Sequence, residues 1–345
     1  MDRQAIFASL FGFPREPQSF ETLAGDASSR RYHRVDFGPG ADPRRVVIME
    51  LPADALASDE AVSGAPPSEL PFLDVGRHLA SRGIRVPAVH LAAVEHGAVV
   101  LEDLGDTTLA RRVAGAPRET MRRWYLAAVD LLARMHRAMW PVPRECVAAT
   151  RRFDCGLLRW ELDHYREWGA EALGGGPLDP PVRARLDAEF DALAADAAAL
   201  SAGFVHRDYQ SRNLMVIGDE PSPASLAVID FQDALVGPRV YDLVALLNDS
   251  YVELDDDLKQ EVIESYARKR GIDAAILRGE FDLITVQRKL KDGGRFVFID
   301  RVKGNPSFLP FVETSFGRVR RALERLPERD GLRAALAAAD PARFG

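Results

Sequence analysis

The apolar residues of the first hundred positions follow the spacing of β-strands. His33, Val35 and Phe37 alternate with polar neighbours, which is typical of a strand with one buried face. Residues 46–51 (VVIMEL) and 98–104 (AVVLEDL) are continuous apolar runs, and such runs indicate covered strands. We therefore predict that the N-terminal part of the chain is built around a sheet.

The remainder of the chain is dominated by the spacing of helices. Within 119–140 the apolar residues recur at i, i+3, i+4 and i+7, and Pro141 ends the pattern. Two more helices are predicted over 157–168 and 182–200. After a short strand at 226–231, we expect helices as far as the C-terminus.

The two parts meet near Gly105 without a long linker. A helix over 69–82 belongs to the N-terminal part, and residues 52–68, rich in Ala, Ser and Pro, are expected to form a mobile connection ahead of it. We predict an α+β chain with two lobes, 1–105 and 106–345, that face a shared cleft.

The composition is that of an ordinary globular protein long enough for two cores, with 47% hydrophobic and 28% charged residues. A net charge of −7 argues against broad nucleic-acid binding, which requires a basic surface, but it allows a local nucleotide site. The first residues contain neither an apolar run that could span a membrane nor a clear signal-peptide pattern. We expect a cytoplasmic protein with a small-molecule substrate, and a monomer by default.

The two cysteines, Cys146 and Cys155, form no CxxC pair and have no cluster of histidines beside them in the sequence. This pattern does not predict a zinc site. In a reducing cytosol both residues are expected to remain thiols.

A dense run of polar residues interrupts the helical part of the chain. The stretch FVHRDYQSRNLMV (204–216) begins and ends with apolar residues, and a charge between two buried segments is costly unless it is paired or bound. Residues 206–208 (HRD), followed by Asn213, have the H-R-D-x-x-x-x-N spacing of a kinase catalytic loop. This spacing lets Asp208 reach an attacking hydroxyl while Asn213 reaches a magnesium ion on the phosphates.

A second acidic magnesium ligand is expected at the end of the next strand. Asp230 occupies that position, directly after the apolar run that ends in Val228 and Ile229. Magnesium takes oxygen ligands and only one or two carboxylates from a protein. We therefore predict Asp208 as the catalytic residue, and Asn213 and Asp230 as ligands of Mg²⁺.

On these residues the chain resembles the aminoglycoside phosphotransferase and choline kinase-like superfamily, which has the protein-kinase fold. Within it the chain looks most like the bacterial N-acetylmuramate/N-acetylglucosamine anomeric kinases of cell-wall recycling. That likeness rests on GDASSRRY (25–32), IDFQDALVGPRVYDLVALLNDSY (229–251) and QRKLKDGGRF (287–296). It implies a small antiparallel-sheet N-lobe, a larger helical C-lobe with the active site in the cleft, ATP and Mg²⁺ as cofactors, and the anomeric hydroxyl of an amino sugar as the acceptor.

The nucleotide is expected at two places in the N-lobe. The small residues of the segment 25–32 let backbone amides approach phosphate oxygens closely, so these residues are assigned to the nucleotide loop: Gly25, Ala27, Ser28 and Ser29. The segment from Glu102 to Leu104 corresponds to the hinge of the kinases that the chain resembles. Its backbone should meet the adenine edge.

The third strand departs from the pattern of protein kinases and aminoglycoside kinases. Those enzymes place a lysine there beside the α- and β-phosphates, but no lysine precedes Lys259 in this chain. Arg30 and Arg31 end the nucleotide loop and point to opposite faces if the segment is a strand, so one of them could take the place of the lysine. We prefer Arg31, because Tyr32 is expected to face the interior of the lobe.

A sugar acceptor needs paired hydrogen-bond donors and acceptors around it. The candidates that flank the catalytic atoms or share one face of the helix over 157–168 are Gln210, Arg212, Asp233, Glu161 and His164.

Two other readings stay open at this stage. The acceptor could be an aminoglycoside, choline or homoserine, although a choline kinase would need an aromatic cage that the segment 153–168 does not offer. A nucleotide-binding pseudokinase is favoured by the missing lysine. The presence of Asp208, Asn213 and Asp230 argues against it, because a binding module needs neither a base nor two metal ligands.

Overall fold

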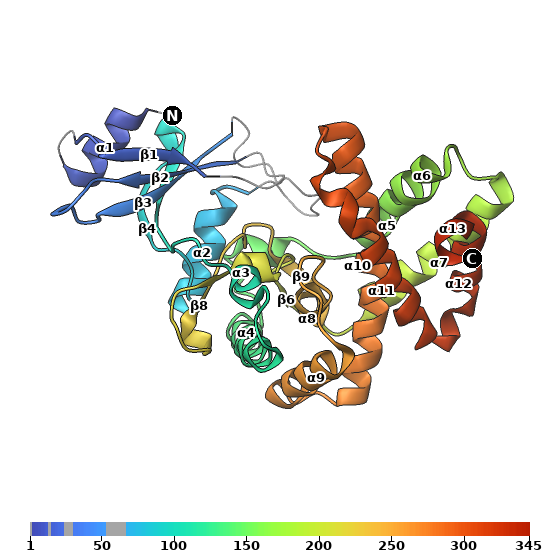
Figure 1. The fold of residues 1–345 in the computed structure, drawn as a ribbon. Coiled ribbons are helices and arrows are strands. Elements are labelled where there is room, and N and C mark those ends of the chain that lie inside the picture. Colours follow the sequence, from blue (N-terminus) through green and yellow to red (C-terminus); the bar gives the residue numbers. More distant parts are fainter. Residues whose placement is uncertain (1, 13–14, 24–29, 53–66) are drawn as a thin grey trace.

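A five-stranded antiparallel sheet forms the N-terminal part of the protein (Figure 1). The computed structural model describes residues 2–12, 15–23, 30–52 and 67–345. The strands lie in the order β1-β2-β3-β5-β4, with the bounds Ser19–Thr22 (β1), Arg31–Asp36 (β2), Arg45–Glu50 (β3), Val89–Ala93 (β4) and Ala98–Glu102 (β5). The two apolar runs pair with each other as β3 and β5, which confirms the predicted strands.

The sheet is covered on both faces. Val46 and Ile48 of β3 pack in a cluster with α1 (Arg3–Phe11), whereas Met49 joins the main core together with α2 (Pro71–Ser81). Because side chains alternate along a strand, a strand buried on both faces has no polar face to show in its sequence. The helix predicted over 69–82 is α2, and the expected mobile connection lies largely in 53–66, outside the described residues.

Helices form most of the remaining chain (Figure 1). The predicted helical segments are α4 (Arg118–Ala138), α5 (Cys155–His164) and α7 (Pro180–Ala199). The other α-helices are α3 (Leu109–Val113), α6 (Ala172–Gly174), α8 (Tyr241–Leu247), α9 (Asp256–Arg270), α10 (Ala274–Lys303), α11 (Val312–Glu324), α12 (Asp330–Ala339) and α13 (Pro341–Phe344). Short 3₁₀ turns are η1 (Val94–His96), η2 (Val147–Thr150), η4 (Ser211–Asn213), η5 (Pro223–Ser225), η6 (Pro306–Phe311) and η7 (Pro327–Arg329). Across the described part of the chain, no helix combines the length and apolar character needed to cross a bilayer.

A π-helical stretch, η3 (Tyr165–Glu171), continues α5 and lies against α10. Gly294 of α10 makes this contact possible, because a Cβ at that position would lie 2.4 Å from the carbonyl oxygen of His164. Single π turns inside helices are found mostly at functional sites. The single helix predicted over 157–168 is therefore two segments of different pitch.

Two small sheets lie between the large sheet and the helices. β6 (Ala202–Val205) pairs with β9 (Leu235–Pro238), and β7 (Leu214–Val216) pairs with β8 (Leu226–Val228). The expectation that helices follow directly after 226–231 is wrong, because β9 comes first. A four-residue strand that contains Gly and Pro has no periodicity from which it could be predicted.

Candidate active site

The polar loop that follows β6 is anchored by one buried carboxylate. Asp242, in the first turn of α8, accepts hydrogen bonds from the backbone N–H groups of His206 (2.7 Å) and Arg207 (2.9 Å). Its Oδ2 also lies 2.9 Å from Nε2 of His136 on α4. A carboxylate that binds two successive amides fixes the path of the backbone, so the loop leaves β6 in a defined direction.

His206 connects this loop with the segment that leads to Asp230. Its Nδ1 accepts a hydrogen bond from the N–H group of Asp208 at 3.3 Å, so Nε2 carries the proton and donates to the carbonyl of Ile229 at 3.1 Å. Burial lowers the pKa of His206, which keeps the ring neutral with one donor and one acceptor. The ring of His206 therefore fixes the distance between the segment that carries Asp208 and the segment that carries Asp230.

Arg207 is part of a fully buried ion pair. Its Nη2 lies 3.0 Å from Oε1 of Glu161, and Gln287 of α10 donates to the other carboxylate oxygen at 2.9 Å. The backbone of Arg207 has φ 82°, a strained conformation for a residue other than glycine. Glu161 is inaccessible to solvent, which favours a structural role, and its contact with an acceptor sugar stays a prediction. The carboxylate of Glu161 holds the loop at Arg207 from the interior of the protein.

Asp208 is held through one of its two carboxylate oxygens. Oδ1 accepts hydrogen bonds from Nη2 of Arg288 at 3.0 Å and from Nε2 of Gln210 at 3.3 Å. Both contacts use the same oxygen, so Oδ2 is the atom presented to an acceptor. Burial by itself would raise the pKa of Asp208, but the positive charges of Arg288, Lys291 and Arg207 hold it below its ordinary value. The carboxylate is therefore ionised at neutral pH.

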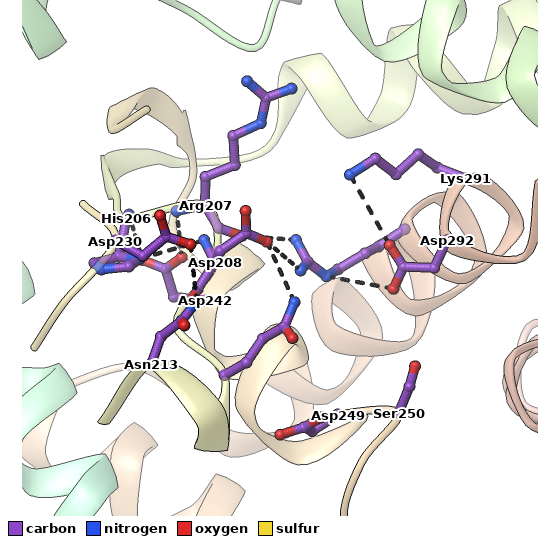
Figure 2. Close-up of polar contacts among 12 residues, drawn as sticks. His206, Arg207, Asp208, Asn213, Asp230, Asp242, Asp249, Ser250, Lys291 and Asp292 are labelled. Carbon is purple, nitrogen blue, oxygen red and sulfur yellow. Dashed lines mark hydrogen bonds and ion pairs between the residues drawn. The ribbon is translucent and has the colours of Figure 1, made fainter. Parts of the chain in front are cut away.

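Asn213 and Asp230 meet beside Asp208 (Figure 2). Nδ2 of Asn213 donates to Oδ2 of Asp230 at 3.2 Å and to the carbonyl of Asp208 at 2.9 Å. Both contacts use the amide nitrogen, so the amide oxygen is the atom that Asn213 offers to a cation. Asp230 has φ 66°, and strained residues of this kind concentrate at functional sites.

The electrostatics of Asp230 fit a site for a divalent cation. Burial and the negative charge of Asp208 raise the pKa of Asp230 to about 6, with Asp233 adding to the effect and a 2.8 Å hydrogen bond from Gln232 opposing it. A nearby cation reverses such a shift because it stabilises the ionised form. Mg²⁺ prefers carboxylate and amide oxygens, so Asn213 and Asp230 suit this ion.

The two arginines next to the predicted nucleotide loop lie on opposite faces, as predicted. Tyr32 packs against the main core, whereas Arg31 lies on the face of His33 and Val35, which is the face that α1 covers. Arg31 is exposed, while Arg30 is buried and its charge partly opposes the rise in the pKa of Asp230 that burial and Asp208 cause. The structure therefore favours Arg30 for the phosphate contact. The remaining residues of the predicted nucleotide loop, Gly25, Ala27, Ser28 and Ser29, lie outside the described residues.

The predicted hinge begins at Glu102, the last residue of β5. The N–H group of Glu102 donates to the carbonyl of Ala88 at 2.8 Å, so in this hinge Glu102 can offer only its carbonyl to an adenine edge. Its carboxylate pairs with Arg85 and accepts a 3.1 Å hydrogen bond from the N–H group of Ala88. The assignment of Glu102 and Leu104 to the adenine site stays a prediction.

Arg34 of β2 fastens the turn that follows this hinge. Its guanidinium bonds to the carboxylates of Asp103 (2.9 Å) and Asp106 (2.8 Å), and to the carbonyl of Gly105 at 3.2 Å. On the far side of the turn, the carbonyl of Thr107 accepts a 2.7 Å hydrogen bond from the N–H group of Val216 in β7.

Two of the predicted acceptor-binding residues lie next to the catalytic atoms. Gln210 bonds to Asp208, as described above. Gln232 links Asp233 to Asp230, because its Nε2 lies 2.8 Å from Oδ1 of Asp230 and 3.3 Å from Oδ2 of Asp233. The roles of Gln210 and Asp233 at an acceptor stay predictions.

The two other candidates make aromatic contacts. The guanidinium of Arg212 lies 3.5 Å above the ring centre of Tyr251. The ring centre of His164 lies 4.6 Å from that of Trp160 and 5.6 Å from that of Phe298. Their roles at an acceptor stay predictions.

Helix α10 adds basic residues that the sequence reasoning did not assign. Arg288, Lys289 and Lys291 are all buried, although buried cations are rare unless paired. Nζ of Lys289 lies 2.7 Å from the carboxylate of Asp292. Nζ of Lys291 lies 4.0 Å from the same carboxylate (Figure 2). The feature of the sequence that could have indicated a site here is the presence of three cationic residues within four positions of a largely apolar helical segment.

Comparison with known proteins agrees with this geometry. Residues 19–278 match the model of the phosphotransferase enzyme family. The chain is 30% identical over 321 residues to the N-acetylmuramate/N-acetylglucosamine kinase of Pseudomonas aeruginosa, with 90% of this chain and 86% of that protein covered.

Solved structures share the fold at low sequence identity. One is a protein of Ralstonia eutropha JMP134 that carries a provisional assignment as an aminoglycoside phosphotransferase, with a TM-score of 0.65, 15% identity and coverage of 95% of this chain and 98% of that one. Another is a thermostable mutant of an aminoglycoside phosphotransferase in a ternary complex with ADP and hygromycin B, with a TM-score of 0.52, 15% identity and coverage of 94% and 98%. These likenesses confirm the predicted protein-kinase-like fold with a small antiparallel sheet and a larger helical part.

Proposed function

The chain belongs to the phosphotransferase enzyme family, and we propose that it transfers the γ-phosphate of ATP to the anomeric hydroxyl of an amino sugar, N-acetylmuramate or N-acetylglucosamine. The observation that carries the proposal is the arrangement of Asp208, whose Oδ1 is held by Arg288 and Gln210 while Oδ2 is open beside Asn213 and Asp230. The acceptor class is supported by the N-acetylmuramate/N-acetylglucosamine kinase of Pseudomonas aeruginosa.

Asp208 would orient the acceptor and receive its proton. The sugar hydroxyl would donate to Oδ2, and its proton would move to the carboxylate as the sugar oxygen forms a bond to the γ-phosphorus. The bond from that phosphorus to the β,γ-bridging oxygen breaks in the same step, and ADP leaves. The low pKa of Asp208 makes it a weak base, so positioning is the larger part of its contribution. This suits phosphoryl transfer, in which most of the catalysis comes from positioning and charge stabilisation.

Asn213 and Asp230 would hold Mg²⁺ through the amide oxygen and a carboxylate oxygen. When bound, the ion would neutralise charge on the β- and γ-phosphate oxygens. Arg30 would place a positive charge near the same phosphates, in the role for which kinases use a lysine of the third strand.

The basic stretch of α10 supports a sugar acid among the acceptors. N-acetylmuramate carries a carboxylate that N-acetylglucosamine lacks, and Arg288 and Lys291 bring positive charge to the side of Asp208. Asp233 and Gln210 supply an acceptor and a donor for hydroxyl groups. The reaction would serve the recycling of cell-wall sugars, and a cytoplasmic monomer stays the expected form of the enzyme.

The decisive experiment is phosphate transfer from ATP to each sugar by the purified full-length protein. We expect ADP to form with N-acetylmuramate, N-acetylglucosamine or both, and phosphorus NMR to show the phosphate on the anomeric oxygen. Kanamycin, choline and homoserine form the comparison panel. Turnover with one of these and none with either sugar would overturn the acceptor assignment, and ATP binding without turnover on any of them would identify a pseudokinase.

A further inference from the structure

Three metal-binding side chains meet outside the catalytic centre. Asp74 and His78, four residues apart on α2, face Cys146, which lies on the segment that leads into η2. One carboxylate oxygen, one ring nitrogen and the sulfur all lie within 4.8 Å of one another. The three residues are only 5%, 8% and 0% exposed. A helix thus presents two ligands at i and i+4, and a distant segment brings the third.

The ring of His78 shows that this cluster is incomplete. Nε2 is buried and makes no hydrogen bond within the described structure. The nearest carboxylate oxygen, Oδ1 of Asp74, is 3.6 Å away, which is too far for a hydrogen bond. Buried polar atoms nearly always have a partner, and one without a partner calls for an explanation such as an ion.

We propose that Asp74, His78 and Cys146 form a Zn²⁺ site that joins α2 to the helical part of the protein. Carboxylate, imidazole and thiolate are the ligand types that zinc combines, and a water molecule would complete four-coordination. Binding displaces the thiol proton of Cys146 to solvent. Burial raises the pKa of Cys146 to about 11, so without a metal the thiol stays protonated and its proton is directed to Asp74.

The neighbouring groups allow this site to form. Ligation through Nε2 places the ring proton of His78 on Nδ1, where Nη1 of Arg82 lies at 3.4 Å. Arg82 has two other acceptors within reach, the carbonyl of His78 at 3.3 Å and Oγ of Ser81 at 3.2 Å, so it can release the ring.

Arg77 covers the cluster on its solvent side. Its Nη2 lies 3.0 Å from Oδ1 of Asp74, and two hydrogen bonds of 2.9 Å join it to Glu69. The side chain is 58% exposed, so it can move aside to admit an ion. Oδ2 of Asp74 accepts a 2.6 Å hydrogen bond from the N–H group of Val147, which keeps the carboxylate directed at the cluster.

A metal at this site would reach the catalytic centre through α2. Phe72, on the same helix, stacks on Phe231 with 4.9 Å between ring centres, and Phe231 directly follows Asp230. A Cβ at Gly76 would lie 3.0 Å from the ring of Phe231, so the helix is packed tightly against this residue. Fixing α2 to Cys146 therefore also fixes the backbone that presents Asp230.

The test uses Co²⁺ as a spectroscopic probe for Zn²⁺ in the full-length, metal-depleted protein. We expect one equivalent of Co²⁺ to give the near-ultraviolet charge-transfer band of a thiolate ligand, and one equivalent of Zn²⁺ to remove it. The Asn213–Asp230 site has only oxygen ligands and cannot produce this band. Cys146→Ser should abolish it, and Cys155→Ser, which changes the other, exposed thiol, should leave it intact.

The outcomes separate the proposal from an ordinary hydrogen-bonded cluster. A thiolate band that persists in Cys146→Ser, or the absence of any band in the parent protein, would overturn it. If Cys146→Ser does not fold, the parent measurement still decides, and His78→Gln provides the second variant. In that variant we expect Zn²⁺ to lose its ability to raise the thermal midpoint, and an unchanged Zn²⁺ effect would count against the site.

Discussion

The guanidinium of Arg288 donates a 3.0 Å hydrogen bond to the carboxylate of Asp208. The same guanidinium donates at 2.7 Å to the carbonyl of Arg207, so it grips the loop at its backbone as well. A residue of a late helix thereby fixes both the position and the charge of the proposed base. Arg288 is a positioning residue, because it acts through Asp208.

Replacing Arg288 should change how the reaction depends on pH. The positive charge holds the pKa of Asp208 down, so in Arg288→Gln that pKa should rise and the acidic limb of the kcat/KM profile should move to higher pH. The lost positioning should lower kcat by up to about 100-fold. Arg301→Gln, at the exposed end of the same helix, is the matched control. An unshifted acidic limb would show that Arg288 does not act through Asp208.

Asp208→Asn should lower kcat by about 100-fold or more, because the amide cannot receive the acceptor proton. Nucleotide binding, measured by a fluorescent ATP analogue, should be preserved, since the substitution leaves the proposed Mg²⁺ ligands Asn213 and Asp230 in place. Nearly normal turnover in this variant would refute the assignment of the base.

Asp230→Asn should abolish Mg²⁺-dependent transfer and at the same time stabilise the metal-free protein. The pKa of Asp230 in the folded state, about 6, lies above its ordinary value of 3.8, so the ionised carboxylate opposes folding. The gain in unfolding free energy should be on the order of 1–3 kcal/mol above about pH 6 and should vanish below about pH 4, where the carboxyl group is protonated in both states.

Thermal unfolding in the presence of a chelator, at several pH values, tests this prediction. Equal thermal midpoints for the parent and the variant at neutral pH would show that the ionised carboxylate of Asp230 does not oppose folding. A Mg²⁺ titration that is unchanged in Asp230→Asn would show that Asp230 is not a ligand of the ion.

Arg30→Ala and Arg31→Ala should have unequal effects, with Arg30 the more important. A charge-assisted phosphate contact contributes about 1.5–3 kcal/mol, which corresponds to a roughly 10- to 150-fold loss of kcat/KM for ATP. Arg31→Ala is the built-in control, because its side chain is exposed on the face that α1 covers. Steady-state kinetics with varied ATP measure both, and the reverse order would restore the preference for Arg31 that the strand alternation alone suggested.

Glu161→Ala should destabilise the protein without changing its affinity for sugar. The substitution removes the buried carboxylate from Arg207, and breaking a buried pair from one side costs about 3–5 kcal/mol. Chemical denaturation measures the loss. A selective rise in KM for the sugar at unchanged stability would instead indicate that Glu161 contacts the acceptor.

The sequence was informative where function restricts spacing within one segment. The HRD-x4-N loop, Asp230 and the covered strands could be predicted because each is encoded by neighbouring residues. The role of Arg288 could not be predicted, since it depends on α10 lying against the loop. Helical periodicity does not reveal which neighbouring element a helix contacts. The buried ion pair of Glu161 could not be predicted for the same reason: its helix face points toward the loop from the interior side.

The structure favours Arg30 where the sequence favoured Arg31, and the reason is a different one. Alternation along a strand shows which residues share a face, but it does not identify the face when both are apolar. Here one face packs on α1 and the other on the main core, so the orientation of Tyr32 had two solutions. The cluster of Asp74, His78 and Cys146 shows the same limit, because the ligands come from separate segments.

The hydrogen bonds between Arg34 and the turn that follows the predicted hinge have a mechanical consequence. Asp103, Gly105 and Asp106 are tied to the sheet, whereas Thr107, the next residue, is tied to β7. The chain therefore changes from a sheet-bound to a β7-bound segment at the single peptide between Asp106 and Thr107. The segment that is predicted to meet the adenine edge is therefore attached to the sheet, so a movement of the sheet would carry this segment along without changing its shape.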